Sequence, residues 1–180
     1  CLMLGTYEPR KGHFFILDAF KEVLAKKKNT YLLICGYATL LQKEKVIAHA
    51  KQLRVINNVI FLNFRSDINN LFAISDVLLI GSQEFESFGL TAVEAMLNKV
   101  PVVSTNVGGL KEVIKNDEGG FVFDKNDKTN FSNKVIELLK NENLRIEQGI
   151  KGSKRAEEFF SAKKMSEEYY KKINIDYGRK

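Results

Sequence analysis

The sequence predicts an α/β fold in three layers, with about six parallel strands and helices on both faces of the sheet. Two observations predict it. Short apolar runs alternate along the chain with segments of helical periodicity, and repeated strand–helix alternation is typical of a parallel sheet. The strand runs are also apolar throughout instead of alternately apolar and polar, as a sheet covered on both faces requires.

Each predicted strand is a short apolar run, and several end at a glycine. The strands are expected at 2–5, 30–36, 58–63, 76–82, 100–105 and 119–123. The first helix is expected at 15–27, where Ile16, Phe20 and Leu24 recur at helical spacing. Asp67 is placed to cap a short helix that begins with it. The helices after the first are expected at 39–54, 67–75, 88–98, 108–115, 127–140, 142–159 and 162–176.

The composition indicates one domain without a membrane span. The chain has 180 residues, only two prolines and no low-complexity stretch, so one domain over 1–180 is expected. No apolar run approaches the ~20 residues that a spanning helix needs. Cys1 and Cys35 border apolar runs and are read as buried, reduced thiols, which favours a cytoplasmic location. No His/Cys cluster has the spacing of metal ligands, so no metal is expected.

The net charge of +6 comes from 28 basic and 22 acidic residues. Solvated helix faces and helix ends are the ordinary explanation of this charge. Attraction to an anionic membrane surface, such as the inner face of a membrane, or to a phosphorylated substrate is the functional alternative. Basic and aromatic residues are not interleaved as in nucleic-acid-binding modules, so no nucleic acid partner is expected.

The chain opens "CLMLG", without an initiator methionine or a signal-peptide pattern. It begins inside what reads as a buried strand. We therefore expect a fragment of a longer protein, from which an upstream domain is missing.

The segment "GTYEPRKG" at 5–12 joins the first strand to the first helix. It matches neither the P-loop nor the G-x-G-x-x-G pattern of nicotinamide-binding proteins. It does place Arg10 and Lys11 beyond the carboxyl end of a parallel strand, where ligands bind in such sheets. Both side chains suit phosphate oxygens. From this loop alone, a phosphate site and an ordinary basic loop are equally supported.

The segment "ESFGLTAVE" at 86–94 holds two glutamates eight positions apart. On one helix, Glu86 and Glu94 would be separated by roughly 12 Å, whereas carboxylates that act on one glycosidic bond lie about 5–9.5 Å apart. They are better suited to hold two ends of one elongated ligand. Between them, the start of a helix at 88–90 offers free amides to an anion, and Gly89 lets a ligand approach. Each glutamate alone could be an ordinary surface residue. Together with the basic loop, the two glutamates favour a ligand-binding site.

With these motifs in order, the sequence resembles the C-terminal half of a retaining glycosyltransferase of the GT-B fold, in the large group called glycosyl transferases group 1 (family GT4). That half is a Rossmann-like domain that binds a nucleotide-activated sugar. The pieces that carry the resemblance cover nearly the whole chain: "GTYEPRKG", "LLICG", "VIFLN", "DVLLIGS", "ESFGLTAVEAM", "VPVVSTNVGGLKEVI" and "GGFVF".

The resemblance implies a role for each candidate residue. Glu94 would hold the ribose hydroxyls, and Glu86 would contact the donor sugar. Lys11 and Arg10 would neutralise the diphosphate leaving group. The amides of Phe88, Gly89 and Leu90 would also bind the substrate, as would Gly5 and Thr6 after the first strand. Arg65 and Ser66, in the Phe64–Ser66 loop, would flank the base.

One residue departs from the family pattern. Thr6 stands where many relatives carry an arginine, and Arg10 would replace that charge only in part. The implied reaction is transfer of a hexose with retention at the anomeric carbon, without a metal. The acceptor, a cell-surface glycan or a lipid-linked molecule, would bind through the missing N-terminal domain.

Two other functions remain open at this stage. The domain could bind nucleotide sugars without transferring them, or it could belong to a GT-B sugar phosphorylase or a nucleotide-sugar epimerase. Both keep the fold and the nucleotide site, and differ in the reaction that follows binding.

Overall fold

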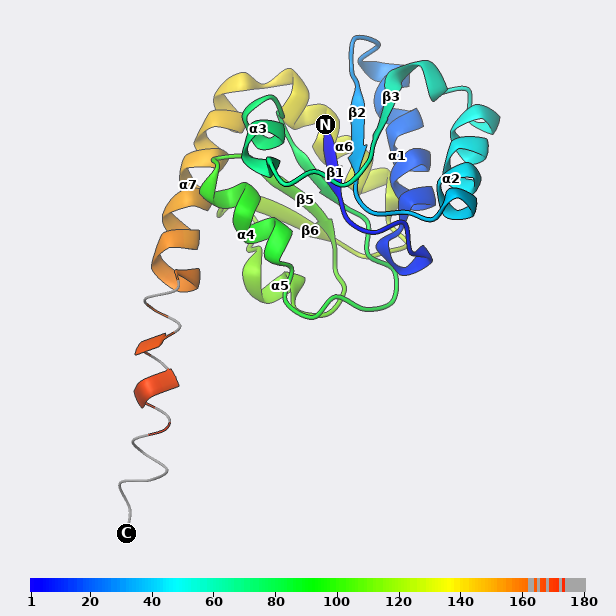
Figure 1. Ribbon diagram of the computed structural model, residues 1–180. Helices are drawn as coiled ribbons and strands as arrows, with labels where there is room; N and C mark the ends of the chain where they lie inside the picture. Colours follow the sequence, from blue (N-terminus) through cyan, green and yellow to red (C-terminus); the bar gives the residue numbers. More distant parts are fainter. Residues whose placement is uncertain (162–163, 165, 168, 172, 174–180) are drawn as a thin grey trace.

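The computed structural model describes residues 1–161, 164, 166–167, 169–171 and 173 (Figure 1). The strands are β1 (Leu2–Leu4), β2 (Leu32–Cys35), β3 (Val59–Leu62), β4 (Leu78–Ile80), β5 (Val102–Thr105) and β6 (Gly120–Phe123). The helices are α1 (His13–Lys26), α2 (Leu40–Gln52), α3 (Ile68–Ala73), α4 (Leu90–Leu97), α5 (Leu110–Val113), α6 (Lys128–Lys140) and α7 (Glu142–Phe160). Two 3₁₀ turns, η1 (Pro9–Lys11) and η2 (Ile56–Asn58), precede α1 and β3.

The six strands form one parallel sheet in the order β3-β2-β1-β4-β5-β6. The chain builds outward from β1 to β3, then returns to the other side of β1 and builds outward again. The topological switch point therefore lies between β1 and β4, where ligands bind beyond the carboxyl ends of the strands.

Apolar side chains cover both faces of the sheet and make two cores. Successive residues of one strand enter different cores, as the two-residue repeat of a strand requires: Met3 packs with α1, α2 and α6, and Leu2 packs with α3, α4 and α5. Figure 1 shows the two helical layers with the sheet between them. The predicted three-layer α/β fold with six parallel strands is confirmed.

Most predicted strands and helices extend one or two residues beyond the observed ends, and the starts of α1 and α4 show a physical reason for the difference. α1 begins at His13, two residues earlier than expected, because Gly12 is its N-cap. The helix expected at 88–98 begins at Leu90, after Gly89 turns the chain with a left-handed φ of 85°. Asp67 occupies the N-cap position of α3, but its side chain makes no capping bond; it accepts hydrogen bonds from Arg65 and Asn70 instead.

The helix predicted at 162–176 lies partly outside the described residues. Those described between 164 and 173 are helical, and Tyr169 and Ile173 are exposed there. Within the described part of the chain, no helix combines the length and the apolar character that crossing a membrane requires.

Candidate functional site

The site is built where the loops after β1 and β4 meet. Gly12 packs so closely on Gly81 that a Cβ on Gly12 would lie 1.8 Å from the Gly81 carbonyl oxygen. The amide of Gln83 donates to the carbonyl of Arg10 at 2.7 Å. These contacts fix the basic loop 5–12 against the loop 81–89, although about seventy residues separate them in the sequence.

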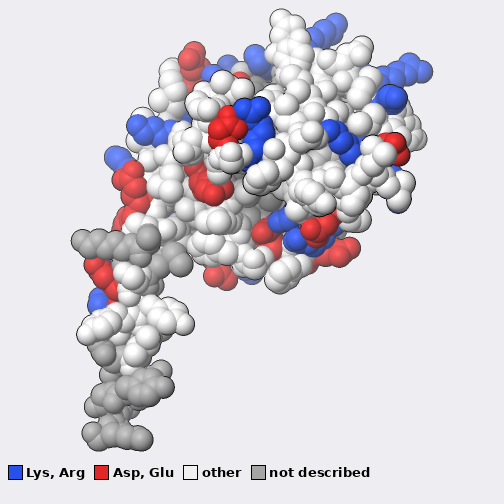
Figure 2. Space-filling view, in the orientation of Figure 1, with Lys and Arg blue, Asp and Glu red and all other residues white. Residues whose placement is uncertain are grey.

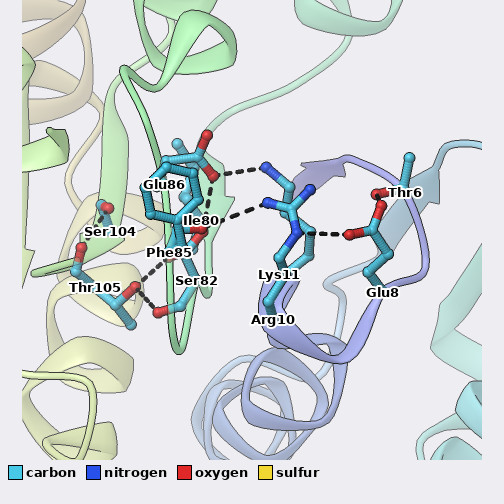
Figure 3. A network of polar contacts seen from close by, with 10 residues as sticks. All are labelled: Thr6, Glu8, Arg10, Lys11, Ile80, Ser82, Phe85, Glu86, Ser104 and Thr105. Carbon is cyan, nitrogen blue, oxygen red and sulfur yellow. Dashed lines mark hydrogen bonds and ion pairs between the residues drawn. The ribbon is translucent and has the colours of Figure 1, made fainter. Parts of the chain in front are cut away.

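Lys11 and Glu86 form an ion pair at this junction (Figure 3). Lys11 Nζ lies 2.6 Å from Glu86 Oε2, and the side chains are only 21% and 13% exposed. Ser82 Oγ donates to the same oxygen at 3.0 Å, and Thr105 Oγ1 donates to the Ser82 carbonyl at 2.7 Å. The pair is thus shielded from water and held by the ends of β4 and β5, which makes it stronger than an exposed pair.

The Lys11–Glu86 ion pair leaves hydrogen-bonding groups on both side chains that a ligand could use. Both contacts to the Glu86 carboxylate converge on Oε2, and Oε1 accepts no hydrogen bond within the described residues. A lysine ammonium carries three N–H donors, of which the ion pair uses one. Lys11 can therefore donate to phosphate while it remains bound to Glu86, and Glu86 can accept from a sugar hydroxyl.

Arg10 lies beside Lys11 but in a more open place. Its Nε donates to Glu8 Oε2 at 2.5 Å, and Nη1 lies 3.5 Å from the carbonyl of Phe85. Thr6 Oγ1 donates to the other oxygen of Glu8 at 2.7 Å. The two hydrogen bonds and the positive charge of Arg10 lower the pKa of Glu8. Glu8 thus neutralises part of the Arg10 charge, and the Thr6 hydroxyl faces Glu8.

The chain beyond Glu86 presents backbone amides to the same place. Gly89 is the N-cap of α4, and the amides of Gly89, Leu90 and Thr91 donate to no other group in the described residues. Free amides at a helix N-terminus, together with the helix dipole, attract anions. Thr91 adds a fourth amide to the predicted set of Phe88, Gly89 and Leu90, because the helix begins later than expected. The side chains of Phe88 and Leu90 are exposed.

Glu94 lies in α4, one turn beyond these amides. Its carboxylate is half-buried and accepts no hydrogen bond or ion pair within the described residues. Burial without such compensation raises its pKa. A partly desolvated carboxylate without a partner is suited to accept hydrogen bonds from a ligand hydroxyl.

Gly5 and the Phe64–Ser66 loop complete the predicted set at the same edge of the sheet. Gly5 lies under the aliphatic chain of Lys11, which passes 3.7 Å from where a Cβ would be. The Phe64–Ser66 loop follows β3, which β2 separates from β1, so it lies farther along the edge. Arg65 is exposed and pairs with Asp67, its Nε donating at 2.8 Å, and Ser66 is exposed.

His13 is the first residue of α1 and sits behind the basic loop. It is 3% exposed and stacks on Tyr7 with ring centroids 4.5 Å apart, and its Nε2 has no hydrogen-bond partner among the described residues. Burial, aided by the charge of Lys11, lowers its pKa to about 4. His13 is therefore neutral near pH 7 and serves packing.

Sequence reasoning missed the residues that hold Glu86 in place. Ser82 ends the "DVLLIGS" run, and its position at the carboxyl end of a central strand could have identified it. Gly108 and Gly109 press against the 86–88 backbone: the Gly109 amide donates to the Glu86 carbonyl at 3.0 Å, and a Cβ on Gly108 would lie 1.9 Å from that oxygen. The predicted buried, free state of Cys1 and Cys35 agrees with the structure.

In the part of the chain that the structure describes, no three His, Cys, Asp or Glu side chains group closely enough to hold a metal ion.

A parallel sheet with a switch point between β1 and β4 and helices on both faces defines a Rossmann-like α/β domain. Residues 1–155 match the family described as "Glycosyl transferases group 1", and the chain belongs to this family. The predicted family is thereby confirmed.

Two curated relatives are similar over most of the chain. N-acetyl-alpha-D-glucosaminyl L-malate synthase of Bacillus anthracis is 31% identical over 157 residues, which is 86% of this chain and 39% of that protein. The capsular polysaccharide biosynthesis glycosyltransferase CapM of Staphylococcus aureus is 31% identical over 167 residues, 92% of this chain and 43% of that protein. The chain thus spans about two fifths of the length of these relatives.

The fold matches that of a solved structure closely. Alr3699/HepE of Anabaena, crystallised with UDP, has a TM-score of 0.89 at 22% identity, over 97% of this chain and 48% of that one. At this identity the likeness shows the fold alone.

Proposed function

We propose that the chain is the donor-binding domain of a retaining glycosyltransferase, which moves a hexose from a nucleoside diphosphate sugar to an acceptor. The observation that carries the proposal is the Lys11–Glu86 ion pair beside the free amides at the start of α4. The family supports the transferase class. The UDP bound by the Anabaena protein of the same fold supports a nucleotide ligand.

The proposed ligand follows the edge of the sheet. The diphosphate lies at the amides of Gly89, Leu90 and Thr91, with Lys11 donating to it. The sugar meets Glu86 Oε1, and the ribose meets the unpartnered carboxylate of Glu94. The base points toward the Phe64–Ser66 loop. This order matches the charges of the site. Lys11 and the free amides meet the anionic diphosphate in the middle, and the carboxylates of Glu86 and Glu94 accept hydrogen bonds from the sugar and the ribose on either side.

The chemistry follows from charge. The bond from the anomeric carbon to the phosphate oxygen breaks, and its electron pair goes to the diphosphate. Lys11 and the α4 amides are placed to stabilise that charge before it forms, which lowers the barrier. The acceptor oxygen bonds to the anomeric carbon on the face that the diphosphate leaves, and the acceptor's proton passes to the departing phosphate.

The partners of the whole protein are part of the proposal. The acceptor, a cell-surface glycan or a lipid-linked molecule, binds through an N-terminal domain that faces this edge. Phe85 and Leu90 are each 61% exposed beside the site, which suits surfaces that a partner domain covers. We place the protein in the cytoplasm, at most in peripheral contact with the membrane. Figure 2 shows basic and acidic groups intermixed on one face, so such contact would be local.

Calorimetry with UDP, GDP and ADP tests the proposal. We expect one of the three to bind at micromolar to millimolar concentration, and excess chelator to leave the affinity unchanged because no metal is proposed. Failure of all three to bind would contradict it. Transfer activity of the full-length protein that is lost in Glu86→Ala would exclude a binding-only module. A labelled donor incubated without an acceptor would reveal an epimerase or a phosphorylase.

A further inference from the structure

The most deeply buried arginine in the described chain, Arg155, holds the end of α5. It lies in α7 and is 9% exposed. Its Nε donates to the carbonyl of Val113 and its Nη2 to the carbonyl of Glu112, both at 2.9 Å, and its Nη1 lies 3.2 Å from Glu118 Oε2. These two carbonyls end a helix and have no partner within it. The planar fork of arginine bridges both, which a lysine cannot do.

The other end of α5 packs against residues 86–89, the loop proposed to bind the donor. The Gly109 amide donates to the carbonyl of Glu86, and Gly108 has no room for a side chain against that same carbonyl. Leu110 contacts Gly89 so closely that a Cβ there would lie 2.6 Å from the leucine Cδ2. A shift of α5 would therefore move Glu86 and Gly89, the residues proposed to meet the sugar and the phosphate.

A second line of contacts reaches the same loop. The guanidinium carbon of Arg155 lies 5.7 Å from the ring centroid of Phe160, within cation–π range. Phe160 in turn meets Phe88 edge to face, with centroids 5.6 Å apart. Phe88 immediately precedes Gly89, so α7 supports the loop through its aromatic end as well as through α5.

We propose that Arg155 is a positioning residue that holds residues 86–89 in the geometry that binds the donor. It touches no ligand itself; it acts through α5 and through Phe160. The proposal deepens the donor-binding function above and rests on it for the ligand. It predicts that replacing Arg155 disturbs the loop even when the domain remains folded.

The test compares Arg155→Lys with Arg145→Lys. Arg145 lies in the same helix and is tied to the Leu138 carbonyl at 2.9 Å and to Asp76 at 3.1 Å, away from the donor loop. Both variants keep their charge and lose a fork of hydrogen bonds, so both should lower Tm. Amide exchange by NMR, well below Tm, then reports on the ligand-free loop. We expect exchange of the Gly109 amide to rise about tenfold in Arg155→Lys only.

Binding gives the second readout. We expect Arg155→Lys to weaken nucleoside diphosphate binding about tenfold and to leave nucleoside binding unchanged, whereas Arg145→Lys changes neither. Unchanged Gly109 exchange in Arg155→Lys, or equal changes in both variants, would overturn the positioning role. If the unmodified chain binds no diphosphate, the proposed function fails, and the exchange result still decides the role of Arg155.

Discussion

The two ends of the proposed donor site are built differently. At the phosphate end, Lys11, Ser82 and Glu86 come from loops after two central strands and form a shielded network. At the base end, Arg65 lies in the loop after the edge strand β3, is exposed, and pairs with Asp67 two residues away. One end depends on tertiary packing, and the other on local sequence.

The difference indicates how the work is divided. Charge stabilisation requires donors fixed in advance in a place with little water. Recognition of a base can rely on a loop that varies without disturbing the sheet. Substitutions at the phosphate end should therefore affect both binding and stability, and substitutions at the base end should affect binding slightly.

Lys11→Ala should have the largest effect. It removes the phosphate donor and leaves the shielded Glu86 carboxylate unpaired, so that an anion repels the diphosphate. We expect nucleoside diphosphate affinity to fall roughly 100-fold or more, and nucleoside affinity to change little. Arg10→Ala is the control: because Arg10 is more open and already paired with Glu8, it should cost only a few-fold. Equal losses for nucleoside and diphosphate would show that Lys11 does not contact phosphate.

The burial of His13 behind the basic loop should make the stability of the fold depend on pH. Its pKa is about 4 when folded and 6.5 in the ordinary state. Below pH 6.5 the unfolded chain takes up a proton that the folded chain refuses, so stability falls as the pH drops toward 4. Between pH 7 and pH 5 this amounts to about 2 kcal/mol.

We expect His13→Phe to remove that part of the pH dependence, measured by urea unfolding at pH 5 and pH 7. His49→Phe is the control, since His49 is only partly buried and pairs with Asp18 at 2.8 Å. A His13→Phe variant with the pH dependence of the unmodified chain would show that His13 titrates normally.

Glu94→Gln should separate binding from stability. The pKa of Glu94 is raised by burial, so its charged form costs stability at pH values above the unfolded pKa. The amide removes that cost, and Tm at pH 7 should rise slightly. Loss of a charged acceptor for the ribose hydroxyls should weaken nucleoside and nucleotide binding alike, roughly tenfold. A variant that binds as before would exclude Glu94 from the ribose site.

Arg65→Ala should have the smallest effect. The side chain is exposed and its ion pair is local, so Tm should change by less than about 1 °C. We expect nucleotide affinity to fall no more than about threefold. A loss as large as that of Lys11→Ala would mean that the base end carries binding energy, and the contrast between the two ends would fail.

The sequence was sufficient for the fold and for the ends of the strands. Unbroken apolar runs predicted buried parallel strands, and Lys11, Glu86 and Glu94 could be selected because residues after parallel strands meet at one edge. What could not be predicted depends on tertiary approach. Ser82 stands at the end of a strand run, but that it holds the Glu86 carboxylate follows only from the tertiary structure. Arg155 carries no local pattern, and its importance follows from the two carbonyls that it reaches. Gly89 turns the chain with a left-handed φ and lies so close to Leu110 that a side chain would not fit; the turn delays the helix and leaves the Thr91 amide free within the described residues.

A crystal structure of the chain soaked with a nucleoside diphosphate tests the central claim most directly. We expect diphosphate density against the amides of Gly89, Leu90 and Thr91, with Lys11 Nζ within hydrogen-bond distance of a phosphate oxygen. Density elsewhere on the sheet edge, or a Lys11 side chain turned away from the phosphates, would contradict it.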